Sequence, residues 1–332
     1  MVRPVAGDAV RQADTLARQG RVPEAYRLLE TAIAGGDALA AATLANWRLS
    51  GQIIRRDLGA ARDLFGRAAA LGLEEAAPIY IALLANGAGG TKRQWAQAIA
   101  LLKARGGGDA KAQWQADLLD AMALTEVGDP LDVPPVQQRC AQPRVETVAG
   151  FMTPDECRYL VELATPMLQP SVVVHPTTGQ FVRDPVRRAK SVGFPFVQED
   201  PVLHAINRRI AAATGTRYDQ GEPLQVLCYD PGDEYKLHVD ALPPGNNQRV
   251  KTFLVALTAD FDGGETSFPH LGLDWRGHVG DALHFANVDS VGKVDQQTQH
   301  TGKQVTRGRK YLLSKWIRAQ TLDLAGPPNR PF

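Results

Sequence analysis

An internal repeat in the first part of this 332-residue chain constrains the fold most strongly. Three segments align at offsets of 36 and 37 residues: EAYRLLETAIAGGD from Glu24, AARDLFGRAAALGL from Ala60 and QAIALLKARGGGD from Gln97. A repeat of this length with two helices per unit is typical of an α-solenoid. The apolar positions that coincide are Ala25, Ala61 and Ala98, then Leu28, Leu64 and Leu101, and finally Leu29, Phe65 and Leu102.

Each of the first two units continues into a second helix, in which Ala41 and Ala77 occupy matching positions. These units end at Gly51 and Gly87, and glycine commonly closes a helix in a left-handed cap. The repeat resembles the Sel1-like branch of the tetratricopeptide repeats over about residues 22–122. An ordinary helical bundle is the alternative.

A proline-rich segment separates the repeats from a chain of different character. Residues 127–145 hold four prolines and break the helical pattern. We therefore predict a helical repeat domain at residues 1–128, a linker at 129–144, a second domain at 145–320 and a C-terminal tail at 321–332.

The second domain reads as a β-sandwich or barrel that follows one helix. The helix is predicted in MTPDECRYLVELATPML from Met152, with Thr153 or Asp155 as its cap. Short β-rich runs then follow, separated by Gly, Pro and Asp: LQVLCYD, TFLVALT, DALHFAN and KYLLSKWIRA. The stretches 170–190 and 241–249 are predicted to be long loops, which in compact domains often bind ligands.

Composition removes several classes of function. The formal net charge is +1, from 37 Lys and Arg against 36 Asp and Glu, so binding to nucleic acid is not expected. No apolar run approaches the ~18–20 residues that span a bilayer, and no membrane partner is expected. Three cysteines without a CxxC motif argue against a disulfide framework. We expect a cytoplasmic protein.

The first candidate for chemistry is the pair His238 and Asp240. A spacing of two places both side chains on one face of a strand. His300, 62 residues further on, can supply a third ligand. Two imidazoles and one carboxylate leave three coordination positions of a metal open, which suits non-haem Fe(II) with O2 and a chelating cosubstrate. The alternative is a solvated strand pair and a loop histidine.

Two further residues fit such a site. Lys310 follows His300 by ten residues, and a fixed cation beside the metal can bind the distal carboxylate of 2-oxoglutarate. Tyr229, nine residues before His238, can offer a phenol to the same carboxylate. Arg307 and Arg309 are competing cations, although Arg309 should face away from Lys310 on a strand.

These motifs together resemble the catalytic domain of prolyl 4-hydroxylases, members of the Fe(II)/2-oxoglutarate dioxygenase superfamily, over residues 145–320. The matching pieces run in order: Y-x-P-G-D-x-Y-x-x-H-x-D, R-V-x-T-x-L-x-A-L-T, GGETSFP, GDALHFAN, H-T-G-x-x-V-x-x-G-x-K and K-W-I-R. The resemblance implies a double-stranded β-helix, or jelly roll, with the metal at one mouth. The whole chain is thus expected to be a multidomain α and β protein, an α-solenoid followed by a jelly roll.

The resemblance also implies a role for each matching residue. His238, Asp240 and His300 would bind Fe(II), and Lys310 and Tyr229 the 2-oxoglutarate carboxylate. Further residues would line the pocket (Thr252 and Trp316) or hold the substrate (Arg249 and Tyr235). The chain departs from the family pattern at Arg318, where some members have His, and at Tyr311, where Trp is common. Both departures bear on which substrate the protein binds more than on the type of reaction.

The expected activity is hydroxylation of a peptidyl residue, proline first, with succinate and CO2 as co-products and ascorbate as reductant. A protein or peptide is the expected partner, because solenoids present extended surfaces. Two alternatives stay open: hydroxylation of a free amino acid or small metabolite, and a non-catalytic jelly-roll scaffold.

Overall fold

The computed structural model describes residues 7–90, 92–174, 181–183 and 186–325. The contacts divide the chain into two compact units. The first combines the N-terminal part up to Leu131 with Pro195–Ile206 and Ala325, and the second combines Asp132–Phe194 with Asn207–Leu324. No helix in the described part of the chain is long and apolar enough to cross a membrane.

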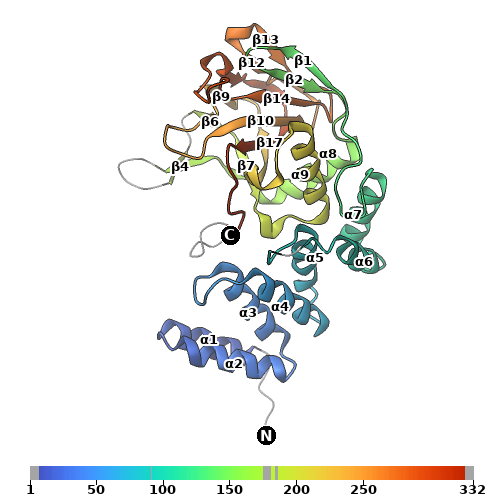
Figure 1. Ribbon diagram of the computed structural model, residues 1–332, viewed down its shortest axis with the longest axis vertical. Helices are drawn as coiled ribbons and strands as arrows, with labels where there is room; N and C mark the ends of the chain where they lie inside the picture. Colours follow the sequence, from blue (N-terminus) through green and yellow to red (C-terminus); the bar gives the residue numbers. More distant parts are fainter. Residues whose placement is uncertain (1–6, 91, 175–180, 184–185, 326–332) are drawn as a thin grey trace. The chain divides into compact units, whose positions relative to one another are not determined.

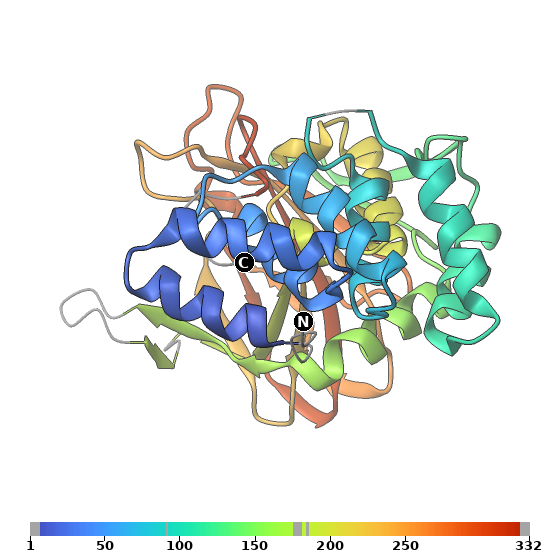
Figure 2. The same cartoon turned by 90° about the horizontal axis from the view of Figure 1, so that it is seen from below.

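The first unit is a run of helices in which each packs against the next (Figures 1 and 2). Asp37, Asp57 and Asp109 cap three of the helices by accepting backbone N–H bonds through their side chains. The helices are α1 (Asp8–Arg18), α2 (Val22–Ala34), α3 (Ala38–Ser50), α4 (Leu58–Ala70), α5 (Ala76–Asn86), α6 (Trp95–Gly106) and α7 (Ala110–Ala121).

Burial in the helical unit follows the repeat. The small residues Ala25, Ala61 and Ala98 are completely buried, which lets neighbouring helices approach closely. The bulky residues that fill the space between helices are buried as well, and they are Leu29, Phe65 and Leu102. Gly51 and Gly87 end α3 and α5 in the left-handed conformation, at φ 69° and 78°, as the sequence predicted. The N-terminal helical repeats are therefore confirmed.

The second unit contains two antiparallel sheets. The larger has the strand order β1-β2-β14-β10-β17-β8-β7-β3, and the smaller has the order β13-β12-β15-β9-β6. The larger sheet is built from β1 (Val136–Cys140), β2 (Val145–Val148), β14 (Ala282–Ala286), β10 (Arg249–Ala256), β17 (Lys310–Arg318), β8 (Leu224–Tyr229), β7 (Lys190–Phe194) and β3 (Gln169–Pro170). The smaller is built from β13 (Leu273–Trp275), β12 (Thr266–Phe268), β15 (His300–Gly302), β9 (Glu234–His238) and β6 (Arg187–Arg188).

Two short two-stranded sheets complete the strands: β4 (Val172–Val174) with β5 (Phe181–Arg183), and β11 (Phe261–Gly263) with β16 (Val305–Gly308). Five 3₁₀ turns are described as well, at Thr165–Met167, Phe196–Gln198, Tyr218–Gln220, Pro269–Leu271 and Gln296–Thr298.

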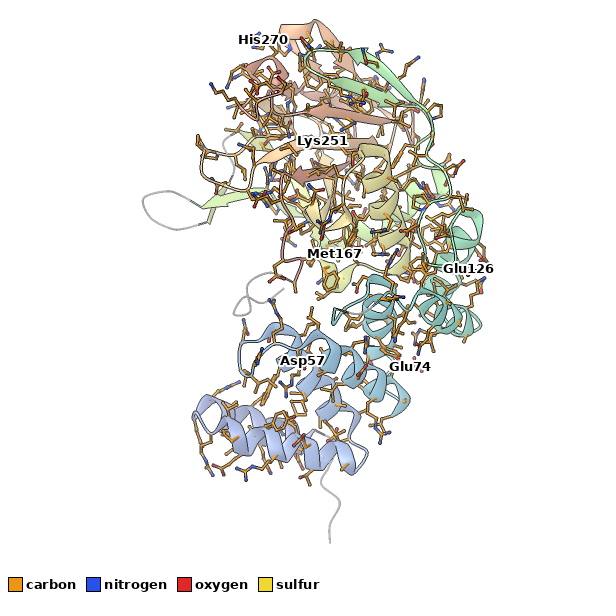
Figure 3. The ribbon with its side chains drawn as sticks, viewed as in Figure 1. Asp57, Glu74, Glu126, Met167, Lys251 and His270 are labelled. Atoms are coloured by element: carbon orange, nitrogen blue, oxygen red, sulfur yellow. The ribbon has the colours of Figure 1, made fainter. Side chains whose placement is uncertain are left out.

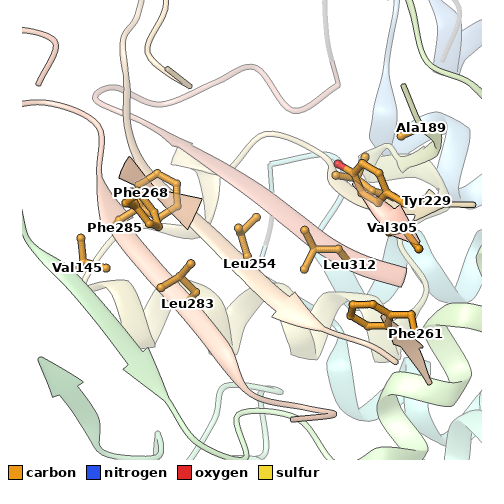
Figure 4. Packing of buried hydrophobic residues seen from close by; sticks show 11 residues of the cluster. Val145, Ala189, Tyr229, Leu254, Phe261, Phe268, Leu283, Phe285, Val305 and Leu312 are labelled. Atoms are coloured by element: carbon orange, nitrogen blue, oxygen red, sulfur yellow. The ribbon is translucent and has the colours of Figure 1, made fainter. Parts of the chain in front are cut away.

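The core lies between the two sheets (Figure 4). Phe268 of the smaller sheet packs edge-on against Phe285 of the larger, with ring centres 5.0 Å apart. Leu254, Leu283 and Leu312 belong to the same buried cluster. Two antiparallel sheets closed over one apolar core form the jelly roll, as the sequence predicted.

Helix α8 (Pro154–Ala164) belongs to the second unit, whereas α9 (Pro201–Thr214) begins in the first unit and belongs to the second from Asn207 on. Thr153 begins α8 in a capping box with Glu156, which selects Thr153 over Asp155 as the cap. Glu156 also receives two bonds from Arg209 of α9, at 2.8 and 2.9 Å, and this buried pair joins the two helices.

Local structure differs from the sequence prediction in two segments. The predicted linker 129–144 contains β1, which pairs with β2 and extends the larger sheet. The predicted loop 170–190 contains β4, β5 and β6, while its residues 175–180 and 184–185 lie outside the described residues. The domain boundaries themselves remain predictions. The tail 321–332 is described only to Ala325.

Candidate active site

Three predicted ligands meet at one mouth of the jelly roll. His238 ends β9 and His300 begins β15, and the two are direct cross-strand partners in the smaller sheet. The sequence predicted that Asp240 lies on the same strand as His238, but Asp240 lies two residues beyond the end of β9. Its carboxylate oxygens are 3.6 Å from His238 Nε2 and 3.7 Å from His300 Nε2. One donor atom from each residue lies within 4.8 Å of the other two.

Backbone contacts fix which nitrogen of each imidazole faces the carboxylate. His238 Nδ1 donates to the Lys236 carbonyl at 2.7 Å, and His300 Nδ1 donates to the Thr298 carbonyl at 3.0 Å. Both Nε2 atoms therefore carry lone pairs directed to the same point. His238 Nε2 is buried without a hydrogen-bond partner among the described residues, as expected of an atom that awaits a ligand.

A chain of hydrogen bonds orients the carboxylate. Asn287 Nδ2 donates to Thr252 Oγ1 at 3.0 Å, and Thr252 Oγ1 donates to Asp240 Oδ2 at 2.6 Å. All three residues are buried. The Thr252 hydroxyl therefore acts on Asp240, and Thr252 is not among the residues that line the cavity, which differs from the expected pocket role.

Charge states in the triad suit metal binding. Burial lowers the pKa of His300 to about 4, although the nearby Asp240 opposes this shift. Burial disfavours the Asp240 carboxylate, but the two imidazoles and the Thr252 hydroxyl outweigh it and hold the pKa of Asp240 below its ordinary value. Ionised carboxylate beside neutral imidazole is the protonation state that a divalent metal requires.

The triad borders an open pocket whose empty space, open solvent included, is about 390 Å³. One wall is β17, whose alternate residues face inward. The lining residues are Leu227, Tyr229, Tyr235, His238, Asp240, Leu254, Thr266, His300, Gly302, Lys310, Leu312, Ser314 and Trp316. The mixture of apolar walls and a few polar groups is typical of a small-molecule site.

Lys310 is the cation of this cavity. It is 5% exposed, its Nζ donates to the Gly264 carbonyl at 2.7 Å, and it lies 5.3 Å from the centre of the Tyr229 ring. Burial lowers the pKa of Lys310 to about 8 and raises the pKa of the Tyr229 phenol. Its hydrogen bond among the described residues is to a neutral carbonyl, so the ammonium can still gain a carboxylate.

The competing cations are used elsewhere. Arg307 bonds Asp262 at 2.6 Å, and Arg309 bonds Asp230 at 2.7 Å. Both side chains are more than half exposed, and neither lines the cavity. Geometry therefore favours Lys310 over Arg307 and Arg309 as the partner of a carboxylate ligand.

Tyr235 lies directly on the triad. Its ring stacks on the His238 imidazole, with centres 3.5 Å apart and planes 15° apart. The Arg187 guanidinium lies 5.7 Å from the centre of the same ring. Tyr235 therefore forms part of the cavity wall beside the predicted ligands, and its expected contact with the substrate stays a prediction.

Arg249 stands behind another wall residue. Its guanidinium covers the Trp316 ring at 3.8 Å from the ring centre, and it forms two bonds with Glu222, at 2.6 and 2.8 Å. Trp316 lines the cavity as expected. Arg249 does not itself line the cavity, and its expected role in holding the substrate stays a prediction.

Sequence reasoning missed several residues of the site. Thr266 and Ser314 line the cavity, and Asn287 and Glu222 act on predicted residues. Ser314 could have been found by alternation along β17, since it shares a face with Lys310. Glu222 gave no local signal, because its partners are distant in the sequence. Asn287 ends the matching piece GDALHFAN, but its partner Thr252 lies 35 residues away, so that piece alone did not indicate its role.

The residues present fit Fe(II). Two imidazole nitrogens and one carboxylate form a set with open positions, and each histidine has a backbone partner that orients its ring. The inward face of β17 then offers an ammonium for an anionic cosubstrate. The position of these residues at one mouth of the jelly roll agrees with the place that the resemblance implied for the metal.

Comparison with known proteins finds prolyl 4-hydroxylases among the relatives of this chain. Residues 224–318 match the model of the 2OG-Fe(II) oxygenase superfamily. Prolyl 4-hydroxylase 1 of Arabidopsis thaliana is 35% identical over 195 residues, covering 53% of this chain and 69% of the relative. Prolyl 4-hydroxylase 13 of the same plant is 32% identical over 201 residues, covering 54% and 73%.

Among solved structures, a viral collagen prolyl hydroxylase from Paramecium Bursaria Chlorella virus-1, in complex with 2OG, is 27% identical with a TM-score of 0.43. That match covers 53% of this chain and 96% of the viral chain.

Proposed function

Because the chain belongs to the prolyl 4-hydroxylase family of the 2OG-Fe(II) oxygenase superfamily, we propose that it hydroxylates a residue within a peptide, proline first. The protein is an Fe(II)- and 2-oxoglutarate-dependent dioxygenase. The observation that carries the proposal is the convergence of His238, Asp240 and His300 at a cavity that also holds a buried cation.

In this proposal the three convergent side chains are the protein ligands of Fe(II). Bound Fe(II) would supply O2 activation coupled to decarboxylation of 2-oxoglutarate, which gives succinate and CO2. Asp240 would carry the one negative charge of the ligand set, and Thr252 orients its carboxylate by donating to one oxygen.

Lys310 and Tyr229 are the proposed partners of the distal 2-oxoglutarate carboxylate. The ammonium supplies the charge, and the phenol stays protonated because burial raises its pKa, so it can donate a hydrogen bond. Leu227, Leu254 and Leu312 line the same cavity and limit the water that competes for the pair.

The substrate side of the site is proposed to involve Tyr235 and Arg249. Tyr235 offers an aromatic face beside the ligands, and aromatic faces pack well against proline rings. Arg249 acts through the Trp316 ring that it covers. Ascorbate is the proposed reductant.

We also propose that the helical repeats present protein substrates. Repeated helix pairs form extended surfaces, and proline-containing segments are already extended, so binding them costs less entropy. The free amino acid alternative predicts no dependence on substrate length. A scaffold without catalysis has no need of the complete ligand set and its buried lysine.

The test is mass spectrometry of proline-containing peptides incubated with the full chain, Fe(II), 2-oxoglutarate and ascorbate. The expected result is a gain of one oxygen atom on a peptidyl proline, matched by an equal amount of succinate. Oxygen gain only on free amino acids would overturn the peptide proposal while leaving the dioxygenase chemistry intact.

A further inference from the structure

Two arginines stand opposite each other at one end of β10 and β17. Arg249 begins β10, Arg318 ends β17, and the two are direct cross-strand partners. Like charges in directly opposed positions destabilise a sheet. The arginine side chains are 19% and 17% exposed, so water screens their repulsion only in part.

A single carboxylate is shared between them. Glu222 Oε1 accepts a hydrogen bond from Arg249 Nε at 2.6 Å and another from Arg318 Nε at 2.5 Å. Glu222 Oε2 accepts a second hydrogen bond from Arg249. Arg318 Nη1 donates to the Asn247 carbonyl, which brings no charge. Two guanidinium groups and one carboxylate leave this cluster with a net charge of +1.

Donors exceed acceptors at the same place. Among the described residues, Arg249 Nη1 and Arg318 Nη2 have no hydrogen-bond partner. Trp316, which Arg249 covers, is 7% exposed, and its Nε1 is buried without a partner in the described part of the chain. Trp316 Nε1 is a buried N–H without a partner, which costs stability, and the two guanidinium nitrogens beside it can donate to an added acceptor.

The cluster borders the cavity through β17. Lys310, Leu312, Ser314 and Trp316 line the cavity, and Arg318 is the next residue of the same face. The strand thus offers one cation at its start and another at its end. The two lie eight residues apart, about 27 Å along a strand at ~3.4 Å per residue, so one small ligand cannot satisfy both.

We propose that Arg249, Arg318 and Trp316 form an anion subsite that binds a carboxylate of the substrate. This inference rests on the proposed function, because it takes the cavity as a hydroxylation site. The carboxylate comes either from an Asp or Glu beside the target residue or from the α-carboxylate of a chain end or free amino acid. Glu222 holds the two guanidinium groups together and leaves them one positive charge.

The test compares acid and amide substrates on the full chain. Capped peptides carry Glu or Gln at each position within two residues of the target proline, and free proline is compared with prolinamide. The variant Arg318→Gln removes the surplus charge. Arg307→Gln removes an equal charge from the exposed Asp262 pair and serves as the matched control.

The wild type and Arg307→Gln should prefer the acid about tenfold in kcat/KM in at least one pair, the effect of one charge-assisted hydrogen bond at a partly exposed site. Arg318→Gln should reduce the ratio of kcat/KM between the acid and the amide substrate to about one. Preference within the capped peptides identifies a side-chain carboxylate, and preference for free proline identifies an α-carboxylate.

Equal use of acid and amide in every pair by an active wild type would overturn the subsite and leave the hydroxylase proposal standing. So would a preference that survives Arg318→Gln. If no substrate gains oxygen, the proposed function fails, and the subsite is then judged by calorimetric binding of the same pairs to the full chain loaded with Mn(II) and 2-oxoglutarate under argon. The same tenfold ratio is expected there, and its absence refutes the inference.

Discussion

Replacing Lys310 by Met should stabilise the protein in the absence of ligands. The ammonium is buried, and its pKa falls from the ordinary 10.5 to about 8 because burial removes its water. At about 1.4 kcal/mol per pH unit, keeping the charge at neutral pH costs about 3 kcal/mol. Met has a similar length and no charge.

Part of this gain is lost again. Met cannot donate to the Gly264 carbonyl, and an unpaired buried carbonyl costs about 1–2 kcal/mol. The net expectation for Lys310→Met is therefore a gain of about 1–2 kcal/mol at pH 7.

The pH dependence identifies the cause. A lysine whose pKa is lower in the folded state destabilises the fold fully below pH 8, and the penalty disappears as pH rises from about 8 to 10.5, where the unfolded chain also loses the proton. The wild type should therefore gain stability over this range relative to Lys310→Met. The advantage of the variant should vanish between about pH 9 and 10 and reverse at higher pH, because Met still lacks the bond to the Gly264 carbonyl.

The assay is urea unfolding in the presence of EDTA and the absence of 2-oxoglutarate. Unfolding is monitored by hydrogen exchange of the backbone amides in β10 and β17, which reports the β unit alone. Lys303→Met is the control, because Lys303 is half exposed and pairs with Asp274. A Lys310→Met variant that is less stable at pH 7, or whose advantage does not change with pH, would refute the argument. The same variant should lose 2-oxoglutarate binding.

Three further outcomes are expected. Asp240→Ala removes the only negative ligand, so Fe(II) affinity and succinate formation should collapse while circular dichroism stays unchanged; succinate formation at saturating iron would contradict the assignment. Thr252→Val leaves one Asp240 oxygen without its donor and should weaken Fe(II) binding about tenfold, as loss of a residue that orients a ligand does, measured by metal titration; unchanged affinity would show that the carboxylate needs no support. Deleting residues 1–128 should yield aggregated protein, because Phe196 and Val197 are buried in the helical unit and Asn86 bonds the Phe196 carbonyl. The effect of substrate length must therefore be measured on the full chain. A soluble monomer of the truncated protein in gel filtration would contradict this expectation.

Local pattern was enough to predict much of the fold. The repeat positions Ala25 and Ala61 are buried, and β8, β10, β14 and β17 coincide with the apolar runs in the sequence. These features depend on periodicity and on Gly or Pro at the ends, which are properties of neighbouring residues. The convergence of His238 and His300 was predictable only because several motifs occurred together in a known order.

Other features depend on contacts between distant segments. Residues 195–206 belong to the helical unit although they lie far along the chain, since their partners Asn86 and Gln115 come from α5 and α7. Glu222 serves two arginines that only strand pairing brings together. Nothing within a window of a few residues indicates such partners.

The pairing of His238 with His300 has a consequence for motion. The smaller sheet is made of strands of two to five residues, whereas β17 in the larger sheet has nine. Short strands hold few backbone bonds and open easily. A metal held by adjacent strands joins them across 62 residues of sequence and so restrains a large loop.

The metal should therefore slow amide exchange in β9, β12 and β15 much more than in β10 and β17, which exchange mass spectrometry with and without Mn(II) can measure. Equal slowing in both sheets would refute this. The strands that bind the ion are then the most mobile part of the barrel when the ion is absent. After metal loss, these strands at the mouth of the jelly roll would open before the rest of the domain unfolds.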